Sequence, residues 1–265
     1  MQWENLTARE FKAAVQKTKV CVIAFGVLEK HGDHLPLGTD FLNGHKLACL
    51  AAEKELAVVW PPFYFGQINE ARCFPGTVTL KPSLLVELIQ GIFDEIGRNG
   101  FRKIVMYNAH GGNNQLLPFL TQCNLWSAKP YSLYLPPLGF LTIDRQKKWT
   151  ALCETKEDSH AGECETSVSL ANYPQLVRME CVPKQPATAK QRMKLLPPTM
   201  TGVRWYSDYP EHYAGDARPA TAAKGQLMRD LLVDSLAEYI AAVKKDRVVP
   251  ALERDFFRRV RTVAQ

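Results

Sequence analysis

Short apolar runs alternate with longer segments of helical character along most of this chain. Apolar runs of strand length occupy residues 19–25, 57–60, 102–107 and 131–135. Helical composition or spacing covers residues 42–56, 83–98, 114–128 and 220–243. This alternation predicts right-handed crossovers and a mainly parallel central sheet with helices on both faces, which is an α/β fold of the three-layer αβα sandwich type.

Two segments depart from this alternation. Residues 136–162 hold few apolar anchors and many polar positions, which predicts a long loop, and a long loop beside a site often serves as a lid. The tail, residues 246–265, is predicted to be a helix that is solvated or contacts another subunit, because apolar residues lie between its charges. Since there is neither a linker-like change in composition nor a repeat, residues 1–265 are expected to form a single domain.

Composition narrows the class of protein. The 265 residues are 46% hydrophobic and 23% charged, as in an ordinary globular protein. No apolar run approaches the ~18 residues of a membrane span, and the N-terminus does not resemble a secretory signal. The seven cysteines form no Cys-x-x-Cys pair, which is typical of reduced thiols, and the net charge of +6 is dispersed. We therefore expect a cytoplasmic protein that binds neither membranes nor nucleic acid.

Residues suited to metal binding gather directly after the first predicted strand. Within residues 26–40 the chain places Glu29, His31, His34 and Asp40, interrupted by glycines and a proline that disfavour a helix. Imidazoles and carboxylates are the ligands that zinc- or manganese-type ions take. A cluster just beyond the carboxyl end of a strand lies where α/β proteins place their active sites.

A second histidine follows the third predicted strand. This strand ends at Asn108 and is followed by His110 and a Gly-Gly pair, after which a helix is expected. Because the carboxyl ends of parallel strands meet at one edge, His110 should emerge beside Glu29 and His31. The glycines allow the backbone to pass close to a bound group.

A third group lies within residues 158–167, at the start of another predicted helix. It contains His160, Glu163 and Glu165. One glutamate in the first turn is explained by the favourable interaction with the positive end of the helix dipole. Two glutamates and a histidine are more than capping requires, so this segment is a further candidate for the site.

Five short strings of the sequence resemble motifs of one known family. The strings are Glu-Lys-His-Gly-Asp-His-Leu-Pro-Leu-Gly-Thr-Asp at 29–40, Phe-Pro-Gly-Thr at 74–77, Asn-Ala-His-Gly-Gly-Asn at 108–113, His-Ala-Gly-Glu-Cys-Glu-Thr-Ser at 160–167 and Gly-Asp-Ala-Arg-Pro-Ala-Thr at 215–221. They resemble the signatures of the creatininase (creatinine amidohydrolase) family, in the same order. Since they span roughly residues 20 to 225, the resemblance implies the whole fold and not a single motif.

The resemblance implies a metal centre and assigns roles to its residues. The implied ligands are Glu29, His31, Asp40, His110 and Glu163. Five side chains exceed what one tetrahedral zinc uses, which favours two divalent ions (zinc, manganese or iron) bridged by Asp40. His160 resembles the family's catalytic or substrate-binding histidine. Glu165 is interpreted as structural or supporting, and His34 as a residue that braces the loop or orients a ligand.

The sequence gives fewer indications of which residues contact the substrate. Asn113, Arg72 and Trp149 are candidates for substrate contacts, with Trp149 on the predicted lid. Creatininase proper carries a ligand glutamate where this chain has Gly112, and residues 67–73 do not resemble the segment that usually precedes Phe-Pro-Gly-Thr. We therefore expect a member of the broader family rather than creatininase proper.

The resulting hypothesis is a metal-dependent hydrolase that cleaves a carbon–nitrogen bond in a cyclic amide or formamide, using a hydroxide activated by the two ions. One alternative is a ring-opening hydrolase or isomerase that acts on a cyclic polyol ketone or sugar derivative at the same site, because function resides in the site and not in the fold. A second alternative, a non-catalytic metal-binding assembly protein, is disfavoured by the intact ligand set. A small-molecule substrate and a homo-oligomer, with a hexamer as one form, are expected by resemblance.

Overall fold

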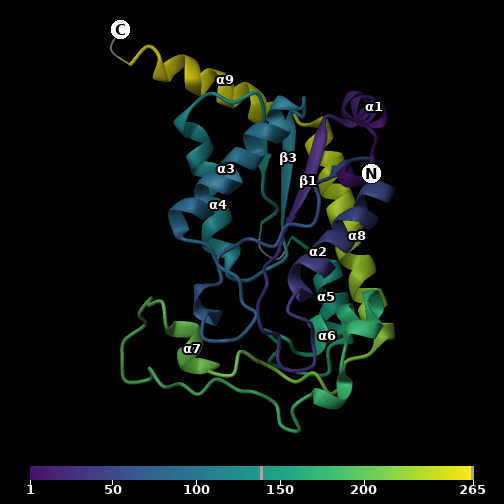
Figure 1. Cartoon of the computed structure of the whole chain (residues 1–265), viewed down its shortest axis with the longest axis vertical. Helices are drawn as coiled ribbons and strands as arrows, with labels where there is room; N and C mark the ends of the chain where they lie inside the picture. The colour runs from purple at the N-terminus through teal and green to yellow at the C-terminus, as the bar shows by residue number, and fades with distance from the viewer. Residues whose placement is uncertain (138–139, 264–265) are drawn as a thin grey trace.

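The central element is a sheet of four parallel strands in the order β2-β1-β3-β4 (Figure 1). In the computed structural model, which describes residues 1–137 and 140–263, these strands are β1 (Val20–Phe25), β2 (Val58–Val59), β3 (Lys103–Asn108) and β4 (Ser132–Tyr134). All of them fall within or beside the apolar runs, so the predicted strands and their parallel arrangement are confirmed. Phe25 pairs with Asn108, and thus β1 and β3 end at the same level.

Helices cover both faces of this sheet. On one face, α2 (Thr39–Lys54) and α8 (Ala222–Lys245) pack against alternate residues of β1 such as Val22. On the other face, α1 (Ala8–Thr18), α3 (Pro82–Arg98) and α4 (Asn113–Cys123) pack against the intervening residues such as Ile23. Because both faces are covered, β1 is buried along its whole length, as a parallel strand requires. The three-layer αβα architecture is confirmed.

The segment predicted as a long loop contains a helix, so that prediction is wrong in part. Within residues 136–162 the chain forms α5 (Ile143–Leu152). The side chain of Thr142 accepts a hydrogen bond from the backbone of Arg145 and thereby caps the helix. Arg145 also pairs with Glu238 of α8. None of the residues of α5 is buried, so the apolar periodicity that marks most helices is missing here.

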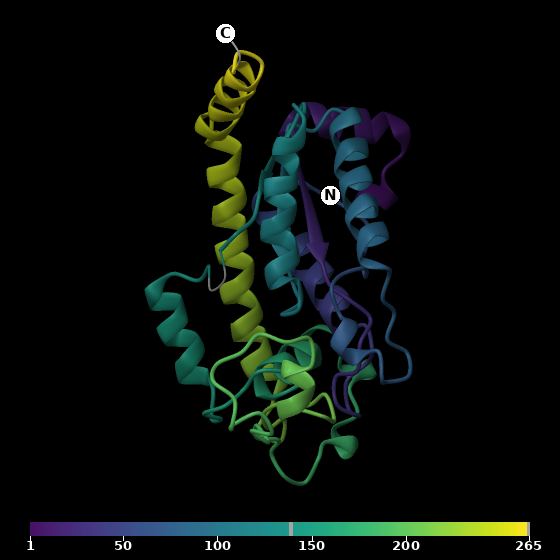
Figure 2. The ribbon, with the colours of Figure 1, turned by 90° about the vertical axis from the view of Figure 1, so that its left-hand side faces the viewer.

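A long irregular segment covers the carboxyl edge of the sheet. It runs from the end of α6 (Glu163–Asn172) to α8 and includes the short helix α7 (Arg204–Asp208) and 3-10 turns at Pro174–Leu176 and Met179–Cys181. A bridge between Ala214 of this segment and His160, which lies just before α6, fastens the segment beside the start of that helix. In Figures 1 and 2 this segment lies at the opposite end of the molecule from α9 (Val248–Val260).

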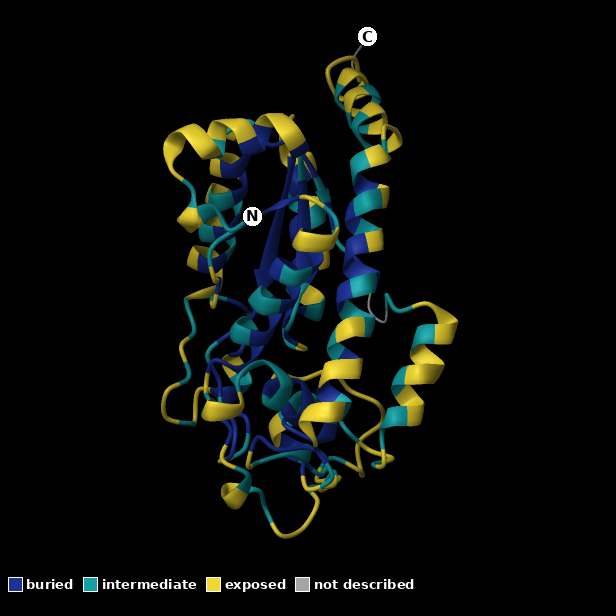
Figure 3. Cartoon of the chain, turned by 90° about the vertical axis from the view of Figure 1, so that its right-hand side faces the viewer, coloured by how far each residue is buried: buried dark blue, intermediate teal, exposed yellow. Residues whose placement is uncertain are grey.

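The tail forms the predicted helix, α9, and this helix stands apart from the core. Figure 3 shows the strands buried between the helices, whereas α9 projects with much of its surface exposed. Leu252 and Val260 are among its exposed apolar residues. Among the residues that the structure describes, no helix combines the length and the apolar character needed to cross a membrane.

Candidate metal centre

Four of the predicted ligands meet at the carboxyl edge of the sheet. Glu29 and His31 lie on the loop after β1, Asp40 on the first turn of α2, and His110 directly after β3. The matched ends of β1 and β3 explain why residues some 80 positions apart become neighbours. All four side chains are buried, with exposed fractions between 0% and 8%. Burying this many titratable groups is costly unless they are paired or hold a cation.

The ring of His110 is held from one side and faces two carboxylates on the other. Its Nε2–H donates to the backbone oxygen of Gln67 at 2.9 Å. Its Nδ1 lies 2.8 Å from Oε1 of Glu29 and 2.8 Å from Oδ2 of Asp40. Neither of these buried oxygens receives a well-directed hydrogen bond from the described residues. A lone pair and two carboxylate oxygens therefore converge on one point, which requires a proton or a metal ion between them.

His31 repeats this arrangement. Its Nδ1 lies 3.3 Å from the backbone oxygen of Glu29, and its Nε2 lies 3.0 Å from Oδ1 of Asp40. In both imidazoles a backbone carbonyl holds the outer nitrogen, so the inner nitrogen is aimed at the shared carboxylate. Orientation of ligand histidines by such outer hydrogen bonds is common in metal sites.

The electrostatics of this cluster favour positive charge between its carboxylates. Burial lowers the pKa of His31, but the charge of Asp40 and its hydrogen bond outweigh burial and raise the pKa to about 10. Burial also opposes protonation of His110, yet the charges of Asp40 and Glu29 raise its pKa well above 6.5. Positive charge is therefore stabilised between the ligand atoms, and a divalent ion held there would take the place of protons. The donor set and the two oxygens without partners fit such an ion.

The two glutamates at the start of α6 have exchanged places relative to the sequence-based assignment. Glu165 reaches the cluster: its Oε2 lies 4.0 Å from Nε2 of His31 and accepts a hydrogen bond from the backbone of Ala161 at 2.5 Å. Its carboxylate could hold an ion together with His31 and His160. Burial and then the charge of Asp40 raise the pKa of Glu165 to about 7. Such a shift marks a carboxyl group crowded by its neighbours.

Glu163, which was assigned as a ligand, is engaged elsewhere. Its Oε1 lies 2.5 Å from Nζ of Lys224 on α8, and its Oε2 accepts hydrogen bonds from the backbone of Glu154 and Thr155 at 2.9 and 2.8 Å. The assignment is corrected for a geometric reason. Side chains two positions apart on a helix point in different directions, so only one of the two glutamates can face the cluster.

His160 lies where a catalytic histidine would lie. Its ring packs against that of His31 with centroids 4.3 Å apart, and its Nε2 donates to the backbone oxygen of Lys30 at 2.9 Å. Burial and the charge of His31 lower the pKa of His160 to about 3, so the ring is neutral at neutral pH. His34 points away from the cluster and bonds Thr166 of α6 at 2.9 Å, which braces the loop.

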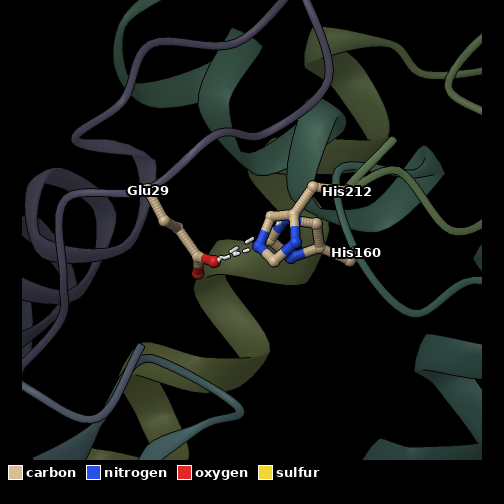
Figure 4. A group of neighbouring side chains, drawn as sticks. All are labelled: Glu29, His160 and His212. Carbon is tan, nitrogen blue, oxygen red and sulfur yellow. Dashed lines mark hydrogen bonds and ion pairs between the residues drawn. The ribbon is translucent and has the colours of Figure 1, made fainter. Parts of the chain in front are cut away.

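Sequence reasoning missed His212 and Trp205. His212 is buried, and its Nε2 lies 2.5 Å from Oε2 of Glu29 (Figure 4). The bridge between His160 and Ala214 carries His212 into the site. No motif marks either residue, because both belong to the irregular segment. The only available signal was their position shortly before the string at 215–221.

A cavity of about 310 Å³ opens onto this centre. Its lining includes Glu29, His110, Gly111, His160, Glu165, Trp205, His212 and Glu70. Three candidate ligands, Glu29, His110 and Glu165, therefore share one accessible space with His160, as chemistry on a bound molecule requires.

The three predicted substrate contacts do not line this cavity. Asn113 is fully buried, accepts a hydrogen bond from the backbone of Gln67 at 3.0 Å and donates one to the carbonyl of Phe25 at 3.4 Å. Arg72 is exposed beside the short 3-10 turn at Asn69–Ala71. Trp149 lines a smaller cavity of about 140 Å³ that also touches Asp40 and Glu165. In this structure Asn113 is thus engaged by backbone groups, and of the three only Trp149 approaches the centre.

Gly112 is required by close packing. A Cβ atom at this position would lie 2.4 Å from the backbone oxygen of Gln67 and 2.4 Å from Nε2 of His110. A larger residue would therefore break the hydrogen bond that orients His110. The position that carries a ligand glutamate in creatininase proper has no room for any side chain here, whereas Gly111 is open.

Comparisons with known proteins identify the family of this chain. The Creatininase (creatinine amidohydrolase) family model matches residues 4–240. The creatinine amidohydrolase of Pseudomonas putida is 27% identical and covers 89% of this chain and 94% of its own. The mycofactocin precursor peptide peptidase of Mycolicibacterium smegmatis is 30% identical and covers 91% of each chain. The 3-dehydro-scyllo-inosose hydrolase of Thermotoga maritima is 23% identical over 90% of this chain and 82% of its own.

Solved structures show the same fold. A solved structure from Bacteroides fragilis has a TM-score of 0.79 at 22% identity and covers 93% of this chain and 97% of its own. A manganese form of creatininase has a TM-score of 0.71 at 24% identity and covers 92% and 99%. The chain belongs to the creatininase family, and it is therefore a hydrolase of that family's α/β fold.

Proposed function

We propose that this protein hydrolyses a carbon–nitrogen amide bond at a centre of two divalent ions, zinc, manganese or iron. The observation that carries the proposal is the convergence of His31 and His110 on Asp40, each ring oriented by a backbone carbonyl. Asp40 presents one oxygen to each histidine, which is the arrangement of a bridging carboxylate. Glu29 would help His110 to hold one ion, and Glu165 would help His31 to hold the other.

The residues of this chain would then have different roles in the reaction. When bound, the ions would supply an activated water and polarise the carbonyl of the substrate. His160 is neutral and donates Nε2–H to the carbonyl of Lys30, which leaves Nδ1 to accept a proton. It can pass that proton to the leaving nitrogen, as a general acid–base residue does. Trp205 and His212 close the cavity from the side of the irregular segment.

The substrate is proposed to be a small amide, such as a cyclic amide or a formamide, or the end of a short peptide. A cavity of about 310 Å³ lies at the lower end of the usual range for ligand pockets. The relatives named for creatinine and for a precursor peptide both act on carbon–nitrogen bonds. One alternative, hydrolysis of a cyclic polyol ketone, is favoured by the relative from Thermotoga maritima, which is named for such a substrate.

A substrate screen tests the proposal. The manganese- and zinc-loaded protein would be assayed on cyclic amides, formamides and short peptides, on cyclic polyol ketones, and separately on creatinine. We expect an amide to be processed with a kcat/KM of about 10⁴ M⁻¹s⁻¹ or more. Turnover of the polyol ketones alone would support the alternative, and turnover of none would contradict both.

Creatinine itself is expected to be a poor substrate. Gly112 stands where creatininase proper is expected to carry a ligand glutamate, and no larger residue fits there without moving His110. A planar ring held about 1 Å out of position can lose roughly 10²-fold in rate. A creatinine kcat/KM in the usual enzyme range would show that this side of the pocket does not set specificity.

A further inference from the structure

His212 makes a buried contact with a candidate metal ligand that no sequence motif explains. Its Nε2 lies 2.5 Å from Oε2 of Glu29, and exposed fractions of 2% and 1% leave neither side chain in contact with bulk water. Figure 4 shows the imidazoles of His160 and His212 facing the Glu29 carboxylate from the same side. A hydrogen bond to a carboxylate in such surroundings is strong and fixes the direction of both groups.

The surroundings of His212 decide which of its nitrogens carries the proton. The indole Nε1–H of Trp205 donates to Nδ1 of His212 at 3.3 Å. An indole nitrogen can only donate, so Nδ1 must offer its lone pair. The proton of the neutral ring is therefore on Nε2, which donates to Oε2 of Glu29.

We propose that His212 is a positioning residue, set by Trp205, that holds Glu29 in the orientation in which it binds metal. Oε2 is occupied by the hydrogen bond from His212, and Oε1 is left to face Nδ1 of His110 at 2.8 Å. The inference rests on the proposed function, since it takes Glu29 as a ligand. It adds a second layer to the centre, built from a segment in which no motif was recognised.

The backbone at His212 supports this role. Its φ of +54° lies in the left-handed region, which residues other than glycine rarely adopt. Its carbonyl accepts a hydrogen bond from Gly32, on the loop that carries Glu29, and the ring of Phe74 packs against its imidazole at 5.4 Å. Strain of this kind persists where the surroundings enforce it, often at functional sites.

One competing role for His212 is that of a ligand. Glu29, His160 and His212 offer atoms that lie within 4.8 Å of one another and could hold an ion. The hydrogen bonds argue against this role, because Nε2 of His212 bears the proton and Nε2 of His160 donates to the carbonyl of Lys30. A neutral imidazole binds a metal through its unprotonated nitrogen, which in His31 and His110 faces Asp40 but in His212 already accepts the hydrogen bond from Trp205.

A Co²⁺ titration distinguishes a positioning role of His212 from a ligand role without measuring enzyme activity. The purified wild-type protein and the variants His212→Phe, His212→Gln and Trp205→Phe would be stripped of metal and titrated with Co²⁺ against a chelator. The readouts are the stoichiometry, the apparent Kd and the visible spectrum of the bound Co²⁺. Thermal unfolding of each metal-free variant serves as a control for folding.

We expect two Co²⁺ ions in every protein, with weaker binding where the hydrogen bond is lost. His212→Phe should weaken binding by about 10- to 100-fold, the usual cost of removing a group that orients a ligand. His212→Gln, whose amide N–H lies near the position of Nε2, should recover most of this loss. Trp205→Phe keeps an aromatic ring but removes the donor, so it should weaken binding less than His212→Phe does.

Three results would overturn the inference, and they differ from one another. If His212→Phe binds Co²⁺ as tightly as wild type, His212 does not position Glu29. If both His212 variants lose one ion and change the spectrum, His212 is itself a ligand. If the wild-type protein binds no Co²⁺, the metal centre of the proposed function fails and the inference fails with it. If His212→Phe does not fold, Trp205→Phe and His212→Gln still test the inference. Wild-type Co²⁺ affinity in Trp205→Phe would contradict the proposal that Trp205 fixes the proton of His212 on Nε2.

Discussion

The candidate centre has two halves that are built in different ways. The sheet half consists of Glu29, His31, Asp40 and His110, which follow strands or open the helix that packs on them. The covering half consists of His160, which lies just before α6, of Glu165 on α6, and of Trp205 and His212 from the irregular segment. The register between β1 and β3 places the first half, whereas the bridge between His160 and Ala214 places much of the second.

This difference shows which half of the centre is suited to binding ions and which is suited to contacting a substrate. The sheet half is buried and held by backbone carbonyls, so it suits binding of the ions, which needs a fixed geometry. The covering half lines the cavity with groups that can contact a substrate or move a proton. We therefore expect substitutions in the sheet half to remove metal outright. In the covering half, substitution of His160 should change the rate alone, whereas substitutions of Glu165, Trp205 and His212 should weaken metal binding or cost at most one ion.

The largest effect is expected for Asp40→Ala. Asp40 presents one oxygen to each histidine, so its loss should abolish binding of both ions and not of one. The ions contribute several kcal/mol to catalysis, so the rate should fall by 10³-fold or more. Elemental analysis of protein purified without chelator should give about two equivalents for wild type and close to none for the variant.

His31→Ala and His110→Ala are the matched controls for Asp40→Ala. Each should remove mainly one ion, because each histidine lies on one side of Asp40. One tightly bound equivalent that survives Asp40→Ala would contradict the assignment of Asp40 as the bridge.

His160→Ala comes next and tests the covering half. If His160 moves a proton and binds no metal, the metal content should stay the same while kcat falls by about 10²- to 10⁴-fold. Metal content and kcat would be measured on the same preparation. A loss of metal that parallels the loss of activity would make His160 a ligand and would remove the functional distinction between the two halves.

The paired variants Glu165→Gln and Glu163→Gln test the corrected assignment. Glu165→Gln should lose one ion or weaken its binding, since Glu165 lies beside His31. Glu163→Gln should keep both ions and instead lower the free energy of unfolding by about 1–3 kcal/mol, because it weakens a buried hydrogen-bonded pair with Lys224. The opposite pattern would restore the assignment based on sequence.

The pH dependence of stability gives a second test of the role of Glu163. Burial raises the pKa of Glu163, but the hydrogen bonds from Lys224 and from the backbone of Glu154 lower it further, to a value below 4.5. A carboxyl group with a lowered pKa stabilises the fold above its unfolded pKa and loses this contribution as the pH falls through the folded pKa. The stability difference between wild type and Glu163→Gln should thus be full at pH 7 and shrink below about pH 4, which chemical denaturation at several pH values would measure.

The same contrast explains what the sequence could predict. The four strands and the ligands that follow them were predicted because apolar periodicity and parallel pairing determine both. The helix α5 was missed because none of its residues is buried. His212 was missed because its place depends on a bridge between Ala214 and His160, two residues 54 positions apart in irregular chain, which no local pattern reveals.

The smallest effects are expected at the mouth of the cavity, where Glu70 and Arg72 form a matched pair. Glu70 lines the cavity, whereas Arg72, which the sequence suggested as a substrate contact, is exposed and does not. Glu70→Gln should raise KM by about tenfold, since a hydrogen bond between a carboxylate and a substrate N–H is worth roughly 1.5–3 kcal/mol. Arg72→Ala should change neither KM nor kcat by more than about twofold, as for an exposed residue outside a site. Steady-state kinetics on the substrate found in the screen decides, with metal content as the control. A rise in KM for Arg72→Ala alone would mean that Arg72 reaches the cavity when substrate is bound, and would extend the covering half to residues 67–73.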